Sequence, residues 1–159
     1  MTEPLTHAES ILIAATPEEV YAVVSDVTRT GEWSPICQES WWDESEGAAA
    51  GPVVGAHFFG RNVLPEREWT TRCQVTAAEP GAAFAWSVGQ GKVEWGYLLE
   101  PAEGGTRLTE TWAFTPVGLA FFHQTYGADA ETQIEARTRN AREGIPATLA
   151  AIKRVVEAR

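Results

Sequence analysis

Residues 15–21 read Ala-Thr-Pro-Glu-Glu-Val-Tyr, and this short stretch changes the chain from a strand to a helix. Thr16 is a good N-cap, Pro17 suits the first helical turn, and Glu19 stands where a capping box places an acidic side chain. The preceding residues, Glu9 to Ala14, have the apolar character of a first strand. The sequence therefore predicts a strand followed at once by a helix.

This helix is short and amphipathic. Its apolar side chains fall at i, i+3, i+4 and i+7 and form one stripe, Val20, Val23, Val24 and Val27. Beyond Trp33-Ser34-Pro35 the chain changes to short segments rich in aromatic and β-branched residues, separated by Gly and Pro breaks. That pattern predicts a meander of about six further strands. Gly89-Gln90-Gly91 lacks the third glycine of a phosphate loop and precedes a strand, so we interpret it as a hairpin turn.

The C-terminal part of the chain has helical periodicity. From Asp129 onward, apolar residues recur at spacings of seven, four, four, three and four, namely Ile134, Ala141, Ile145, Leu149, Ile152 and Val156. This spacing predicts a long helix with one buried face. Pro146 lies inside it and would remove a backbone hydrogen bond, so we expect a bend or a restart there.

The order of these elements predicts an α+β fold in which the helices cover one face of an antiparallel sheet. With 159 residues, of which 44% are hydrophobic, the chain suits one sizeable core. It shows no repeats and no linker-like composition, so we expect a single domain over residues 1–159. Seven tryptophans are many for this size, and they must either pack together or line a site.

The charge and cysteine content exclude several classes of function. Twelve basic against 22 acidic residues give a formal charge of −10, which disfavours nucleic acid and anionic membranes as partners. No apolar run is long enough for a signal segment or a membrane span. The two cysteines, Cys37 and Cys73, form no metal-binding motif, so we expect a soluble cytoplasmic protein without a metal.

The element order, with Ala15 to Tyr21, Ser25-Asp26-Val27 and Glu32-Trp33-Ser34-Pro35, resembles the polyketide cyclase/dehydrase branch of the START-like (SRPBCC, Bet v 1-like) superfamily. The resemblance covers nearly the whole chain. It implies a helix-grip fold, in which a curved seven-stranded antiparallel sheet wraps the long C-terminal helix and short helices follow the first strand. It also implies a cavity for a hydrophobic molecule and no cofactor. Members include cyclases, carriers and interaction modules, so the fold does not choose among them.

Alternating polarity assigns an inward face to four of the strands. We expect this face to hold the ligand-binding side chains Trp69, Thr71, Trp86, Trp95, Tyr97 and Trp112. A few polar groups within an aromatic wall are typical of a ligand site, although core aromatics also fill space without binding anything. Ile145 and Leu149 would form the helical wall of this site.

Glu110 stands out because it shares a face with Leu108, Trp112 and Phe114. A carboxylate there is costly unless it is paired, hydrated or protonated. We interpret it as a candidate general base and Tyr97 as a hydrogen-bond donor to an enolate. A structural ion pair or contact with solvent at the cavity mouth is the alternative for Glu110.

The phase of the third strand stays open in the sequence. If His57 and Arg61 point inward, His57 becomes a second candidate base and Arg61 an anion partner. The other phase leaves both on the convex face. The connection from Pro116 to Gly127 carries Phe122 and other apolar residues, and it is interpreted either as a lid over the site or as a packed helix.

Three functions are compatible with these features. The first is a cofactor-independent protein that binds a small polyketide- or lipid-like molecule and catalyses its cyclisation or dehydration. The second is a carrier or sensor with the same cavity and no chemistry. The third is a protein-interaction module. A polar-studded cavity favours an enzyme, a dry apolar one a carrier, and a filled core the interaction module.

Overall fold

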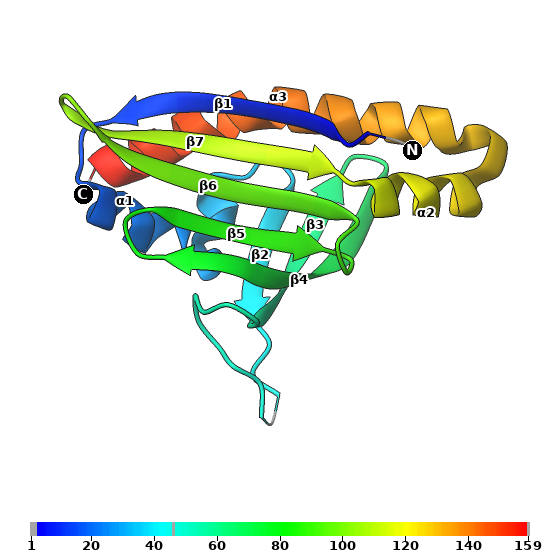
Figure 1. Cartoon of the computed structure of the whole chain (residues 1–159), viewed down its shortest axis with the longest axis horizontal. Helices are drawn as coiled ribbons and strands as arrows, with labels where there is room; N and C mark the ends of the chain where they lie inside the picture. Colours follow the sequence, from blue (N-terminus) through cyan, green and yellow to red (C-terminus); the bar gives the residue numbers. More distant parts are fainter. Residues whose placement is uncertain (1–2, 46, 159) are drawn as a thin grey trace.

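The computed structural model describes residues 3–45 and 47–158 (Figure 1). A strand and two short helices come first, then six strands, then two helices joined by a 3₁₀ turn. The elements are β1 Leu5–Ile13, α1 Pro17–Val24, the 3₁₀ helix η1 Val27–Glu32, β2 Cys37–Trp42, β3 His57–Leu64, β4 Arg67–Glu79, β5 Ala83–Val88, β6 Val93–Ala102, β7 Gly105–Phe114, α2 Pro116–Tyr126, the 3₁₀ turn η2 Gly127–Asp129 and α3 Ala130–Glu157.

All seven strands form one antiparallel sheet in the order β1-β7-β6-β5-β4-β3-β2. Consecutive strands from β2 to β7 are neighbours, and the first strand closes the order by pairing with the last. The prediction of a seven-stranded antiparallel sheet with a long C-terminal helix is confirmed. The first strand begins earlier than the predicted Glu9, at Leu5, because it pairs with β7 along its full length, from Leu5 opposite Phe114 to Ile13 opposite Thr106.

The predicted corner between β1 and α1 is present. The Thr16 hydroxyl accepts a hydrogen bond from the Glu19 backbone N–H, and the Glu19 carboxylate accepts one from the Thr16 N–H, both at 3.1 Å. These bonds satisfy donors that the first helical turn leaves free. The predicted apolar stripe is buried at all four of its positions, from Val20 to Val27.

Helix α3 lies across the concave side of the sheet and runs beside β1 (Figure 1). Its last turn is tied to that strand, because Lys153 Nζ donates to the Leu12 carbonyl at 2.9 Å and the Glu157 carboxylate accepts from the Ala14 N–H at 2.8 Å. The helix does not restart at Pro146. Pro146 is exposed, on the side where water can hydrate the carbonyl that loses its partner.

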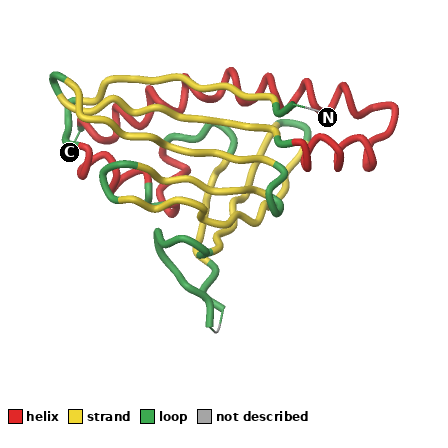
Figure 2. The backbone as a smooth tube through the Cα atoms, viewed as in Figure 1, coloured by secondary structure: helices red, strands yellow, loops and turns green. Residues whose placement is uncertain are grey.

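Two of the connections between strands have clear features. Gly89, Gln90 and Gly91 all have positive φ, between 61° and 88°, and they form the predicted hairpin turn between β5 and β6. The connection between β2 and β3 projects away from the sheet and helices (Figure 2).

Among the described residues, no helix combines the length and apolar character needed to cross a membrane.

Candidate functional site

A cavity of about 480 Å³ lies between the inner face of the sheet and α3. Strands β2 to β7 provide one wall, α3 the facing wall, and residues of η1 and α2 contribute at its ends. Aromatic side chains dominate the lining, and they are Trp33, Phe58, Trp69, Phe84, Trp86, Trp95, Tyr97, Trp112, Phe121 and Phe122. Such a lining, interrupted by a few polar groups, is typical of sites for small apolar molecules.

Most of the site residues predicted from the sequence line this cavity. Eight of them do so, namely Trp69, Thr71, Trp86, Trp95, Tyr97, Glu110, Trp112 and Phe122. Strand pairing explains why they meet, since Trp86 is opposite Trp95, and Trp95 is opposite Trp112, across adjacent strands. Because partners in an antiparallel ladder point to the same face, one row of indoles crosses β5, β6 and β7.

The third strand takes the phase that removes His57 from the cavity. Phe58, Gly60 and Asn62 of β3 line it, and the alternate residues lie on the opposite face of the strand. Arg61 pairs there with the Glu39 carboxylate at 2.9 Å and with Glu68 at 3.5 Å. The assignment of His57 as a second base is therefore corrected, since the strand directs it away from Glu110.

The helical wall also differs from the prediction. Ile145 and Leu149 are fully buried in the core, but neither lines the cavity. The cavity is lined instead by Gly144 and Thr148 of the adjacent helical face and by Ala141, the smallest residue of the predicted stripe. The periodicity of large apolar residues identifies the helical face that packs in the core. It does not identify the face that lines the cavity.

Of the two interpretations of the Pro116–Gly127 connection, the structure shows the packed helix, α2. It is a helix with Thr115 as N-cap, and its aromatic side chains Phe121 and Phe122 line one end of the cavity. The Phe122 ring packs edge-on against Phe114 of the core, with ring centroids 4.9 Å apart. The lining at this end is therefore anchored to the core through Phe122.

Glu110 is the most unusual residue of the site. Its side chain is buried, with 4% of the residue exposed, and its Oε1 atom has no hydrogen-bond partner. Burial raises the pKa of this carboxyl well above its ordinary value. Folding therefore favours the neutral acid, and in that form Glu110 can donate a proton.

Tyr97 lies opposite Glu110 across β6 and β7 and is equally buried. Burial, followed by the proximity of the Glu110 charge, raises the pKa of Tyr97, while a hydrogen bond with the Trp33 side chain acts in the opposite direction. The indole N–H of Trp33 can only donate, so the hydroxyl oxygen of Tyr97 accepts and its own proton remains for another acceptor. In their neutral forms, Glu110 and Tyr97 thus present two hydrogen-bond donors to the cavity.

Sequence reasoning missed several lining residues. Gly60 lies within β3, where an added Cβ would approach Cys37 Sγ at 3.2 Å, and Gly144 lies within α3. A glycine inside a predicted strand or helix is a signal of close approach or of space, and it could have identified both positions. Three basic residues of the lining, Arg67, Lys92 and Arg137, carried no such signal.

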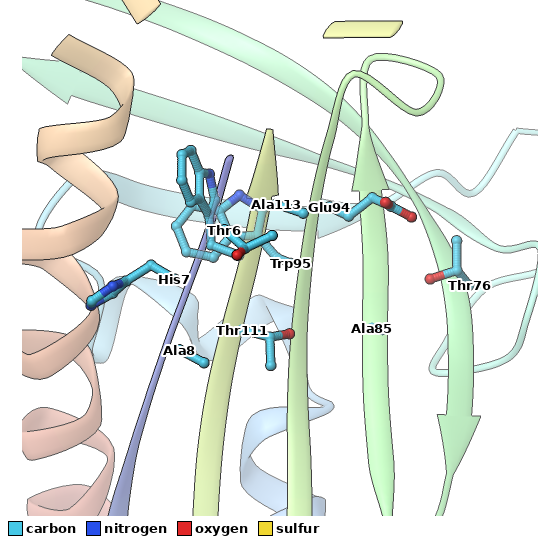
Figure 3. Close-up of a pocket in the computed structure, with 10 residues that line it drawn as sticks. Thr6, His7, Ala8, Thr76, Ala85, Glu94, Trp95, Thr111 and Ala113 are labelled. Carbon is cyan, nitrogen blue, oxygen red and sulfur yellow. The ribbon is translucent and has the colours of Figure 1, made fainter. Parts of the chain in front are cut away.

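A second hollow lies on the outer face of the sheet, across the neighbouring strands β1, β7, β6, β5 and β4 (Figure 3). Many of its lining residues are small ones of the outer face, such as Ala8, Thr76, Ala85 and Thr111. None of its described lining residues is a buried ionisable side chain like Glu110, so we take the inner cavity as the candidate site. Within residues 3–45 and 47–158, no three His, Cys, Asp or Glu side chains gather as metal ligands would.

Comparison with solved structures supports the fold at two levels of similarity. The solution NMR structure of a polyketide-cyclase-like protein from Corynebacterium glutamicum is 56% identical, with a TM-score of 0.71 over 99% of this chain and 94% of that one. The di-domain ARO/CYC protein StfQ from the steffimycin biosynthetic pathway is 13% identical, with a TM-score of 0.70 over 98% of this chain and 51% of that one. Ara h 8.0201 is 15% identical, with a TM-score of 0.60 over 98% and 99% of the two chains.

The two distant structures establish a shared fold, and family membership depends on sequence. A comparison with curated proteins gives no match. Residues 5–157 match the family described as "Polyketide cyclase / dehydrase and lipid transport". Since this match spans all seven strands and α3, the chain belongs to the polyketide cyclase / dehydrase and lipid transport family.

Proposed function

We propose that this protein binds a small hydrophobic molecule, polyketide-like or lipid-like, in the cavity between the sheet and α3. The observation that carries the proposal is an aromatic cavity of about 480 Å³ that contains one buried carboxyl with an unpartnered oxygen. The family to which the chain belongs gives independent support. A cavity of this volume argues against the filled core that an interaction module would have.

The cavity has apolar surface that a ligand can cover and one buried oxygen that lacks a hydrogen-bond partner. Indole and phenyl surfaces gain free energy when they exchange water for an apolar molecule. The free oxygen of Glu110 gains a hydrogen bond if that molecule carries a hydroxyl or carbonyl group at the same depth. A mostly apolar molecule with at least one polar oxygen satisfies both demands.

The direct test is native mass spectrometry of the purified protein, with extraction of whatever copurifies. Titration with a neutral flat probe, N-phenyl-1-naphthylamine, should also change the tryptophan emission, because Trp86, Trp95 and Trp112 share one row of the lining. Trp86→Phe should weaken this response. A protein that carries no small molecule and gives no response at saturating probe would reject the proposal.

The buried acid favours a second candidate function, dehydration of a β-hydroxy ketone in the same cavity. Tyr97 would donate a hydrogen bond to the ketone oxygen while Glu110 transfers its proton to the hydroxyl group. The C–O bond breaks, water departs, and the Glu110 carboxylate takes the proton from the carbon beside the ketone. A carbon–carbon double bond remains and Glu110 regains its proton.

Aromatic β-hydroxy ketones test this step directly. With 4-hydroxy-4-phenylbutan-2-one, formation of the conjugated enone is followed by absorbance. We expect the wild type to accelerate it and Glu110→Gln to abolish the acceleration, while the affinity for N-phenyl-1-naphthylamine changes less than about threefold. Equal rates for the two proteins would remove the catalytic candidate and leave the binding function in place.

A further inference from the structure

Three basic side chains gather at one end of the cavity. Arg67 from the start of β4, Lys92 from the turn before β6 and Arg137 from α3 all line it, next to the aromatic residues of α2. Figure 1 shows that α2 and the β5–β6 turn lie at the same end of the sheet. We refer to Arg67, Lys92 and Arg137 as the cationic end. All three are half-buried, whereas Glu110 and Tyr97 are fully buried.

Neutral groups hold each of these cations in place. The Arg67 guanidinium lies 3.8 Å from the centre of the Trp69 ring, and Lys92 Nζ lies 4.3 Å from that of Phe121 while donating to the Gly89 carbonyl. Arg137 lies 5.4 Å from the Phe122 ring and donates to the Gln133 side chain. Aromatic faces and amide oxygens orient a cation without neutralising it.

No carboxylate of the described residues forms an ion pair with these three cations. Within residues 3–45 and 47–158, the single acidic residue of the lining is the buried Glu110. Burial and then the nearby charge of Arg67 lower the pKa of Arg137, while a hydrogen bond with the Tyr126 side chain acts in the opposite direction. A chain of formal charge −10 therefore concentrates a quarter of its 12 Lys and Arg residues around one apolar cavity.

Since guanidinium and ammonium groups retain unused N–H donors after these contacts, they are suited to bind the oxygens of an anion. We infer that the ligand is an amphipathic anion, whose apolar body fills the aromatic part of the cavity and whose carboxylate- or phosphate-type head is bound by Arg67, Lys92 and Arg137. This inference rests on the proposed binding function and specifies its ligand. An acidic protein can bind an anionic ligand in this way, because the electrostatic potential is locally positive around Arg67, Lys92 and Arg137.

A pair of fluorescent probes with the same ring system isolates the charge. 8-Anilinonaphthalene-1-sulfonate carries an anionic group that N-phenyl-1-naphthylamine lacks. We expect the wild type to bind the anion at least tenfold more tightly than the neutral probe at low ionic strength. Added salt should reduce this preference, because the cations are partly exposed to solvent.

Variants at the cationic end should remove the preference for the anionic probe and leave the cavity intact. In Arg67→Gln/Arg137→Gln the affinity for the anionic probe should fall at least tenfold, while that for the neutral probe changes less than about threefold. Retained binding of the neutral probe also shows that the variant is folded. Arg139→Gln/Arg142→Gln is the matched control, because it removes the same charge from exposed positions of α3 outside the lining.

The possible outcomes separate this inference from the proposed function. If neither probe binds the wild type, the binding function fails. The binding function stands and the anionic ligand is rejected in two cases. In the first, the wild type binds both probes equally. In the second, both double variants lower the affinity for the anionic probe to the same extent. Displacement of the neutral probe by decanoate, decyl phosphate and decanol then identifies the head group, and we expect decanol to be the weakest of the three.

Discussion

Two adjacent faces of α3 differ in what they do, although they lie side by side on the same helix. Ile145, Leu149 and Ile152 have between 0% and 2% of their surface exposed and fill the core. About a quarter turn away, Gly144 and Thr148 face the cavity. The first face fills the core with apolar side chains, and the second leaves the space that forms the cavity.

This difference teaches that stability and function are separable on this helix. The packed face supplies apolar burial, which stabilises the fold whether or not a ligand is present. The cavity face creates surface that remains unsatisfied until a ligand arrives, and it lies opposite Glu110, whose buried oxygen has no partner. Substitutions on the two faces should therefore affect different measurements.

The largest expected effect comes from the packed face. Leu149→Ala should lower the free energy of unfolding by about 2–5 kcal/mol, because it removes a buried side chain and leaves a void. Binding of N-phenyl-1-naphthylamine under native conditions should change less than about threefold, since Leu149 does not line the cavity. Urea titration measures the first quantity and fluorescence the second. A loss below about half a kcal/mol would show that this face is not packed as described.

The unpartnered oxygen of Glu110 should lower the free energy of unfolding. Glu110→Met keeps the approximate length and removes an unsatisfied buried oxygen, so it should raise the free energy of unfolding by about 1–3 kcal/mol. Because folding raises the pKa of this carboxyl, its contribution to stability is greatest below the unfolded pKa and is lost as the pH rises through the folded pKa.

Glu110→Gln tests that pH dependence without changing the shape of the side chain. Its unfolding free energy should vary less with pH than that of the wild type. Glu131→Gln, at an exposed position of α3, reports what the loss of one formal charge does by itself. If Glu110→Gln and the wild type have the same pH profile, Glu110 is not the desolvated acid that the structure indicates.

The sequence predicted the frame and the strand faces of the site, because alternation and capping are local signals. Trp86, Trp95 and Glu110 lie on the expected face for this reason. His57 was left undecided because both faces of its strand carry a mixture of polar and apolar residues, and only pairing with β2 and β4 fixes the phase. Ile145 was assigned to the wall because periodicity reveals which helical face is buried, but not what lies across from it.

Filling the cavity face should affect binding more than stability. Gly144→Leu extends a side chain into a space where the added Cβ would meet one atom within 4 Å, Pro35 Cγ at 3.7 Å. We expect at least a tenfold loss of affinity for the neutral probe and a small change in unfolding free energy. Ala147→Leu adds a comparable side chain at an exposed position of the same helix and should not alter binding. Unchanged binding in Gly144→Leu would mean that ligands do not reach this wall.

The smallest effect should come from a single methyl group on the same face. Gly144→Ala should raise the free energy of unfolding by about 1 kcal/mol, because alanine restricts the unfolded chain and favours the helix. The added Cβ makes only an ordinary contact with Pro35, so no strain opposes this gain. Gly118→Ala in α2 is the matched comparison, since it offers the same helical gain but its Cβ would collide with the Lys92 carbonyl. Thermal melts should therefore move in opposite directions for the two variants, and a loss of stability in Gly144→Ala would show that the space beside this glycine is already occupied.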